Sequence, residues 1–156
     1  MPAVDFRYKQ LGYLVLNVTD IEKTTHFADK VFGLDPMGEA GDMRFFRAGN
    51  GHHDIVLQPA KEASFARASW ELETEADLDK AFAHYKNLGL DPKWVGDNEL
   101  GSLRLERAFR FVEPVLKTTV EYYSKMSQYA IPRKNPLTKF QGGKHYGLAI
   151  PDCKAV

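Results

Sequence analysis

Five histidines are the side chains of this sequence best suited to metal binding or general-base chemistry: His26, His52, His53, His84 and His145. His52 and His53 follow a predicted turn, and adjacent strand residues point to opposite faces, so we expect this pair to be solvated and not to share a metal. His26 and His84 lie in predicted helices without a second ligand four residues on, which indicates helix surface. His145 opens a predicted strand, a recurring position for a metal ligand.

Other residue types offer weaker signals. Cys153 has no neighbouring base in the sequence, so we interpret it as a small buried residue and not as a nucleophile. Five aromatic residues on predicted strands could line a cavity, but aromatic side chains on alternating strands usually fill a core, which is our expectation for Phe45, Phe46, Trp70, Trp94 and Phe109.

The bulk composition excludes several function classes. The chain of 156 residues has 21 basic and 21 acidic side chains, so nothing favours binding to nucleic acid or to an anionic membrane. Its apolar runs are far shorter than a membrane span, and its first ten residues do not resemble a secretory signal. With one cysteine it cannot build a disulfide framework, and we expect a cytoplasmic location.

The elements that would position these residues follow a regular order. Residues 11–18 are rich in branched and apolar side chains, which predicts a strand. Thr19 or Asp20 then caps a helix over 20–32, which Gly33 ends. Three short strands are predicted next, at 36–39, 43–47 and 55–58. Asn50-Gly51 predicts a hairpin turn between the last two of them.

The second half repeats this order. A strand at 66–73 precedes a helix at 75–88, which has acidic residues in its first turn and ends at Gly89. Further strands are predicted at 93–95, 103–112 and 118–123. On the long strand, Arg107 interrupts an otherwise apolar row of Leu103, Leu105, Phe109 and Phe111.

Internal repetition is visible in the sequence itself. Both predicted helices close on Gly-Leu-Asp-Pro, at 33–36 and 89–92, and residues 145–152 align without gaps with residues 13–20. We therefore expect an α+β fold in which two β-α-β-β-β modules form one curved mixed sheet or open barrel with outer helices. The expected organisation is a domain at 1–130 with modules 10–60 and 64–126, a linker at 131–143, and the first strand of a truncated second domain at 144–156.

Paired modules of this kind resemble the vicinal oxygen chelate superfamily, which includes glyoxalases, bleomycin-resistance proteins and extradiol dioxygenases. Residues 11–14 (Leu-Gly-Tyr-Leu) are similar to the opening of the N-terminal domain of type I extradiol ring-cleavage dioxygenases. Residues 109–123 are similar to its closing hairpin, with Glu113 in place of a usual Asp and Leu116 where Gly is common. Residues 143–146 (Gly-Lys-His-Tyr) resemble the start of the C-terminal domain.

The resemblance implies a metal site in the intact protein and no metal, catalytic residue or cofactor in residues 1–130. The family holds Fe(II) or Mn(II) with two histidines and one carboxylate, which leaves positions open for a catechol and for O2. His145 matches the first histidine ligand. Its counterpart in the first module is Tyr13, and the strand opening the second module has Ala68-Ser69-Trp70 where a ligand histidine would be needed. Glu121 lies on the carboxylate-bearing strand, where, without histidine partners, we expect it to form a salt bridge or to cap the mouth of the barrel and not to bind a metal.

The resulting hypothesis is a non-catalytic N-terminal domain whose intact parent cleaves a catechol-type aromatic diol with O2. The alternative is a stand-alone, metal-free binding module similar to bleomycin-resistance proteins, dimeric so that two chains complete each pocket. Either hypothesis implies a homo-oligomer. The linker and the strand that begins near His145 favour the first, because a stand-alone module has no use for them. The length of the native gene product would distinguish the two.

Overall fold

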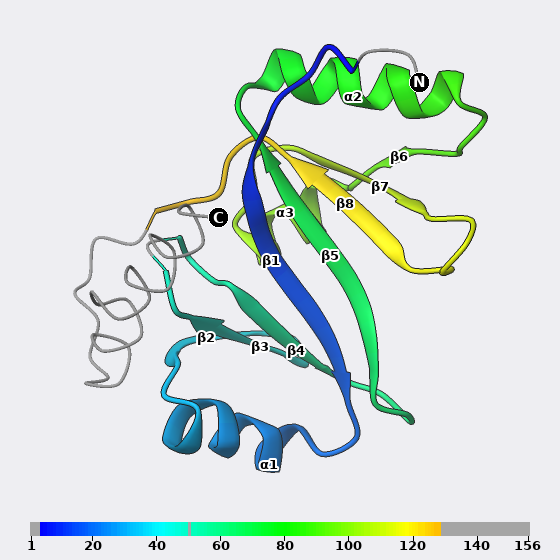
Figure 1. The fold of residues 1–156 in the computed structure, drawn as a ribbon. Helices are drawn as coiled ribbons and strands as arrows, with labels where there is room; N and C mark the ends of the chain where they lie inside the picture. The colour runs from blue at the N-terminus through cyan, green and yellow to red at the C-terminus, as the bar shows by residue number, and fades with distance from the viewer. Residues whose placement is uncertain (1–3, 50, 129–156) are drawn as a thin grey trace, which may run out of the picture.

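Two long antiparallel strands, β1 (Tyr8–Val18) and β5 (Ser64–Leu72), form the spine of the sheet in the computed structural model, which describes residues 4–49 and 51–128 (Figure 1). The first half of the chain continues with α1 (Ile21–His26), the π-helix η1 (Phe27–Val31), β2 (Asp35–Ala40), β3 (Met43–Arg47) and β4 (Ile55–Pro59). The second half continues with α2 (Glu75–Asn87), β6 (Lys93–Trp94), α3 (Asp97–Leu103), β7 (Ala108–Val112) and β8 (Thr119–Tyr123).

The eight strands form a single mixed sheet in the order β2-β3-β4-β1-β5-β8-β7-β6. In the first half β4 runs parallel to β1, and in the second half β8 runs parallel to β5, while every other pairing is antiparallel. The two halves therefore repeat one β-α-β-β-β arrangement about the β1–β5 pair. The predicted fold class is confirmed.

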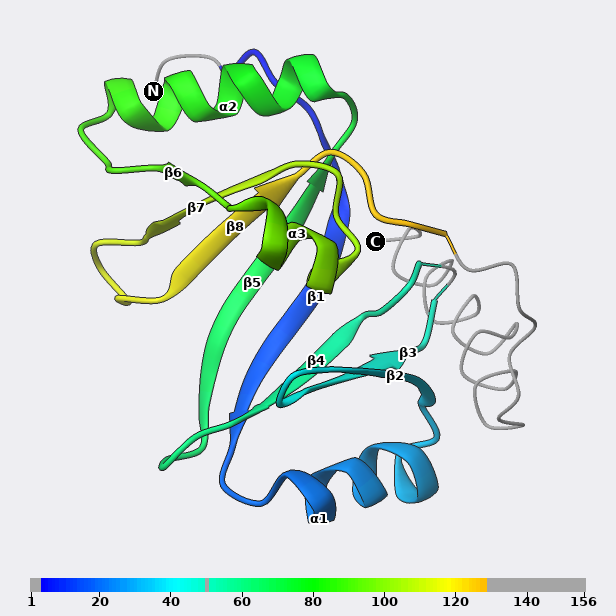
Figure 2. The ribbon, with the colours of Figure 1, turned by 180° about the vertical axis from the view of Figure 1, so that it is seen from behind.

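The outer helices begin where their capping residues are. The Asp20 side chain accepts a hydrogen bond from the Lys23 amide at the start of α1, and the Thr74 hydroxyl does the same for the Asp77 amide at the start of α2. The two helices cover opposite ends of the sheet, whereas α3 lies between its two halves (Figures 1 and 2). None of the helices in the described ranges is long and apolar enough to cross a membrane.

Three apolar clusters hold these layers together. Ala28 and Phe46 belong to the cluster under α1 and η1, and Leu78 and Phe109 belong to the cluster under α2. The third fills the concave side of the sheet and joins both modules to α3: Tyr13, Val15, Phe45, Val56, Leu100, Leu103, Leu105, Ala108, Tyr123 and Met126. Phe45, Phe46 and Phe109 are thus core residues, as expected, and Trp70 is partly buried against the cluster under α2. The same expectation is wrong for Trp94, which is 40% exposed because it lies on the edge strand β6, where its ring stacks on Phe82.

The predicted long strand over 103–112 is wrong. Residues 97–103 form α3, Arg104 ends it in the left-handed conformation, and β7 begins only at Ala108. Leu100 and Leu103 are three residues apart and both buried, so the apolar spacing that suggested a strand also suits a short helix packed on the core. Consequently Arg107 lies outside the core, with its guanidinium 4.1 Å from the Trp94 ring centroid.

The predicted hairpin of β3 and β4 exists, but its turn differs from the expectation. The strands pair antiparallel, and residues 48–54 connect them, with Asn50 outside the described residues. Because β3 ends at Arg47 and β4 begins at Ile55, the connection is longer than the two-residue turn predicted for Asn50-Gly51. Instead, an Asp54 carboxylate oxygen accepts hydrogen bonds from the amides of Ala48 and Gly49 and closes the loop.

Gly12 is required by close packing. A Cβ atom at this position would overlap the hydroxyl end of the buried Tyr123 ring. We expect Gly12→Ala to lower the free energy of unfolding by about 1–3 kcal/mol, because an overpacked core must move its side chains. Gly101→Ala is the matched control: its Cβ meets nothing within 4 Å, and a helical Gly→Ala change should stabilise by roughly 0.5–1 kcal/mol. Urea unfolding measures both, and a Gly12→Ala protein as stable as the unmodified one would refute the packing argument.

Candidate functional site

A row of four polar residues crosses the concave face of the sheet. Tyr13 of β1 pairs with Ser69 of β5, Ser69 pairs with Glu121 of β8, and Glu121 pairs with Arg110 of β7. Directly opposed residues of neighbouring strands point to the same face, so the register alone brings these four side chains together. The row ties the opening strands of both modules to the closing hairpin.

Glu121 is the centre of this row and is fully buried. One carboxylate oxygen accepts hydrogen bonds from the Tyr13 hydroxyl and from the Ser69 hydroxyl, the latter at 2.6 Å. The other oxygen is bonded to Arg110 Nε. Burial, followed by the negative charge of Glu121, raises the pKa of Tyr13, so its phenol stays protonated and donates to the carboxylate.

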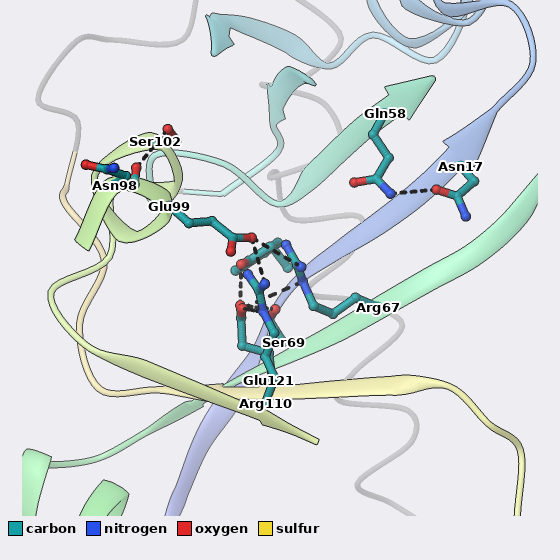
Figure 3. Close-up of polar contacts among 10 residues, drawn as sticks. Asn17, Gln58, Arg67, Ser69, Asn98, Glu99, Ser102, Arg110 and Glu121 are labelled. Carbon is teal, nitrogen blue, oxygen red and sulfur yellow. Dashed lines mark hydrogen bonds and ion pairs between the residues drawn. The ribbon is translucent and has the colours of Figure 1, made fainter. Parts of the chain in front are cut away.

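Two arginines surround the Glu121 carboxylate (Figure 3). Arg67 Nε lies 3.7 Å from the same oxygen that Arg110 contacts. Glu99 of α3 completes the group, because its carboxylate lies 2.6 Å from Arg110 Nη1 and 3.9 Å from Arg67 Nη1. Burial opposes the charge of Arg110, but Glu121 and Glu99 outweigh it and raise the pKa of its guanidinium. The cluster therefore holds two cations and two anions in balance.

This donor set does not fit a catalytic Fe(II) or Mn(II). Such a site needs two imidazoles and one carboxylate with open positions, whereas the row offers a phenol, an aliphatic hydroxyl and a carboxylate already bonded to guanidinium. Within residues 4–49 and 51–128, no three His, Cys, Asp or Glu side chains are grouped for metal binding. Arg110 and Arg67 already supply the positive charge that a bound metal ion would otherwise provide to the Glu121 carboxylate.

Some of the residues that the sequence analysis singled out lie in this cluster, and others lie outside the described part of the chain. The salt bridge predicted for Glu121 is confirmed, and the structure brings Tyr13 and Ser69 to it. His145 and Cys153 lie outside the described residues.

The prediction that His52 and His53 are solvated is wrong. Their exposed fractions are 5% and 1%, and the two Nδ1 atoms are 3.0 Å apart. The argument from opposite strand faces failed because both residues lie in the loop before β4, where strand alternation does not apply. The ring of His53 packs 4.5 Å from that of Tyr13 and 4.9 Å from that of Phe45, inside the concave core.

Comparison with known proteins assigns the chain to a family. The model of the Glyoxalase/Bleomycin resistance protein/Dioxygenase superfamily matches residues 10–93, more than half of the chain. The chain belongs to this superfamily. The predicted relationship is thereby confirmed.

Two relatives of this chain are dioxygenases. The chain is 27% identical over 151 residues to biphenyl-2,3-diol 1,2-dioxygenase of Pseudomonas sp. (strain KKS102), which covers 92% of this chain and 51% of that enzyme. It is 25% identical over 92 residues to the manganese-dependent 2,3-dihydroxybiphenyl 1,2-dioxygenase of Geobacillus genomosp. 3, which covers 58% and 29%. The chain thus spans about half the length of the first relative, and it matches the N-terminal portion of such enzymes.

A solved structure supports the same relationship. Homoprotocatechuate 2,3-dioxygenase from Brevibacterium fuscum, in an anaerobic complex with 3,4-dihydroxyphenylacetate, superposes with a TM-score of 0.72 at 25% identity. The superposition covers 82% of this chain and 39% of that one.

Sequence reasoning missed three residues of the cluster in this superfamily member. Arg67, Arg110 and Glu99 were not predicted as partners of Glu121. The strand pattern could have indicated Arg110. This residue lies in the middle of the apolar strand 108–112, on the face opposite Phe109 and Phe111. It therefore shares a face of the hairpin with Glu121, its partner on β8. Glu99 carried no such signal, because no helix or strand was predicted between residues 95 and 103.

Proposed function

We propose that this chain is the non-catalytic N-terminal domain of an extradiol dioxygenase whose intact form cleaves a catechol-type aromatic diol with O2. The observation that carries the proposal is the state of Glu121. It stands on a strand where a carboxylate ligand is expected, yet its partners are Arg110, Arg67, Tyr13 and Ser69. The relatives that the chain matches are named as dioxygenases of biphenyl-2,3-diol, and a similar solved structure is that of an extradiol ring-cleaving dioxygenase.

The catalytic metal of the proposed enzyme belongs to the part of the protein that follows this domain. In this proposal residues 1–130 form the N-terminal domain, 131–143 a linker and 144–156 the first strand of the second domain. His145 is then the first ligand to Fe(II) or Mn(II), and the remaining ligands come from sequence beyond this chain. When bound, such a metal chelates both diol oxygens and brings O2 next to them.

The proposed role of the described residues is structural. The Glu121 cluster links β1, β5, β7 and β8 with α3, and so fixes the two modules around one closed interior. An ion pair in this place holds the strands without leaving a coordination position open. The domain would then provide a rigid body on which the catalytic half is mounted.

The test uses the complete gene product and two matched histidine variants. We expect the complete protein to cleave 2,3-dihydroxybiphenyl after loading with Fe(II) and ascorbate, and the 156-residue chain to show no cleavage. His145→Ala should lower the rate by more than about 100-fold and lose bound metal, since even a residue that only supports a metal ligand is worth 10–100-fold. His26→Ala removes an exposed helix histidine and should retain both activity and metal.

Two outcomes would contradict the proposal. One is a His145→Ala protein that keeps its activity and its metal. The other is a native gene product of about this length that dimerises and sequesters a small molecule, which would favour the binding-module alternative.

A further inference from the structure

A second feature of the domain is a pocket of about 410 Å³ beside the first half of β1. It is enclosed by β1, by the loop before β4 and by the segment that follows β8, and its lining includes Leu11, His53, Asp54, Glu71, Tyr123 and Met126. None of the residues in the Glu121 cluster lines it. Its volume is in the range typical of small-molecule pockets.

Two polar groups of this lining, one of them a buried nitrogen atom, have no hydrogen-bond partner among the described residues. His53 and Tyr123 are each 1% exposed. His53 Nδ1 is engaged with His52, but its Nε2 atom bonds to nothing within the described part of the chain. The Tyr123 hydroxyl likewise has no hydrogen bond to any described residue, and burial is the main cause that raises its pKa and keeps it protonated. Buried polar groups are usually satisfied, so the His53 nitrogen and the nearby Tyr123 hydroxyl offer a ligand hydroxyl two hydrogen-bonding positions in one lining.

The charges around the pocket decide what kind of guest it accepts. The Glu71 carboxylate is held by Lys9 and Gln10, and the Asp54 carboxylate by two loop amides. Burial lowers the pKa of His53 to about 3, so its imidazole is neutral at pH 7. Two carboxylates against one ammonium leave the pocket slightly negative, which disfavours an anion.

The apolar residues that line the pocket favour a ligand with a planar ring. The Tyr123 ring, the Met126 thioether and the Leu11 side chain provide flat and polarisable apolar surface. A hydroxyl group both donates and accepts, so it can satisfy an imidazole nitrogen of either tautomer as well as a phenol. An uncharged aromatic ligand with a hydroxyl group thus suits the charge of the pocket, its apolar lining and its two hydrogen-bonding groups.

We infer that this pocket binds a small uncharged phenol with a single ring, whose hydroxyl satisfies His53 Nε2 and the Tyr123 hydroxyl. The site belongs to this chain alone and does not depend on the proposed dioxygenase function. It is separate from the Glu121 cluster, none of whose residues line it.

The experiment is an NMR titration of the ¹⁵N-labelled 156-residue chain with phenol, toluene and benzoate. We expect saturable shifts from phenol in residues 51–54 and 123–128, with a Kd near or below about 1 mM. Toluene lacks the hydroxyl and benzoate carries a charge, so each should bind at least about 10-fold more weakly. Tyr123→Phe should raise the Kd for phenol about 5–10-fold, the equivalent of one hydrogen bond.

Tyr122→Phe is the matched control. Tyr122 is the adjacent residue on the same strand, but its hydroxyl points away to Tyr8 and Tyr85, at 3.1 and 2.8 Å, under α2. This variant should bind phenol as the unmodified protein does.

Several results would overturn the inference. Absence of saturation with phenol would mean that the pocket holds only water, and toluene binding as tightly as phenol would mean that the polar groups recognise nothing. An unchanged Kd in Tyr123→Phe, or shifts confined to other parts of the chain, would contradict the assigned site. If Tyr123→Phe disturbs the fold, the comparison of phenol with toluene on the unmodified protein still decides.

Discussion

Glu121→Gln should lower the free energy of unfolding by about 3–5 kcal/mol, the largest effect we expect from a single substitution in this domain. The amide keeps the size of the carboxylate and still accepts from Tyr13 and Ser69. It removes the buried charge that Arg110 and Arg67 share and leaves only the half-exposed Glu99 to balance both guanidinium groups. Breaking a buried ion pair at one partner is strongly destabilising. Urea unfolding of both proteins at pH 7 measures the difference.

Glu106→Gln is the control for this comparison. Glu106 pairs with Lys125 at 3.1 Å, but the two side chains are 57% and 61% exposed. An exposed pair contributes about 0–1 kcal/mol, because water already screens both charges. If the two substitutions cost the same, the central role given to the buried carboxylate is incorrect.

Stability should fall as the pH drops from about 6.5 towards 5, and His53 should account for much of the loss. Burial, and then the charges of His52 and Arg67, lower its pKa from 6.5 to about 3 in the folded chain. Between these values the unfolded chain binds a proton that the folded chain does not, so the free energy of unfolding decreases with falling pH. One such group contributes a slope of roughly 1.4 kcal/mol per pH unit.

The measurement is a series of urea unfolding curves between pH 7 and pH 5, above the range in which most carboxylates titrate. His53→Gln should flatten this dependence, with a remainder from His52, whose pKa burial also lowers. His26→Gln, at an exposed helix position, should keep the slope of the unmodified protein. A slope that survives in His53→Gln would show that another group is responsible.

Much of the fold was predictable because the signals were local. Branched residues gave β1, Asp20 and Thr74 marked the starts of α1 and α2, and the repeated Gly-Leu-Asp-Pro revealed the two modules. α3 was missed because Leu100, Leu103 and Leu105 suit either a helix or a strand, and only their packing against Tyr13 and Phe45 selects the helix.

The sequence by itself determined the module order, which depends on spacing along the chain. It also indicated the superfamily and the place of Glu121 on the closing hairpin, through the resemblance of short motifs to those of known proteins. Only the tertiary structure decided what Glu121 does. Its partners come from strands up to 108 residues away in sequence, and the register of β1, β5 and β8 brings them together. The burial of His53 was likewise beyond the sequence, because exposure of a loop residue depends on which distant segments cover it, here the core around Tyr13 and Phe45.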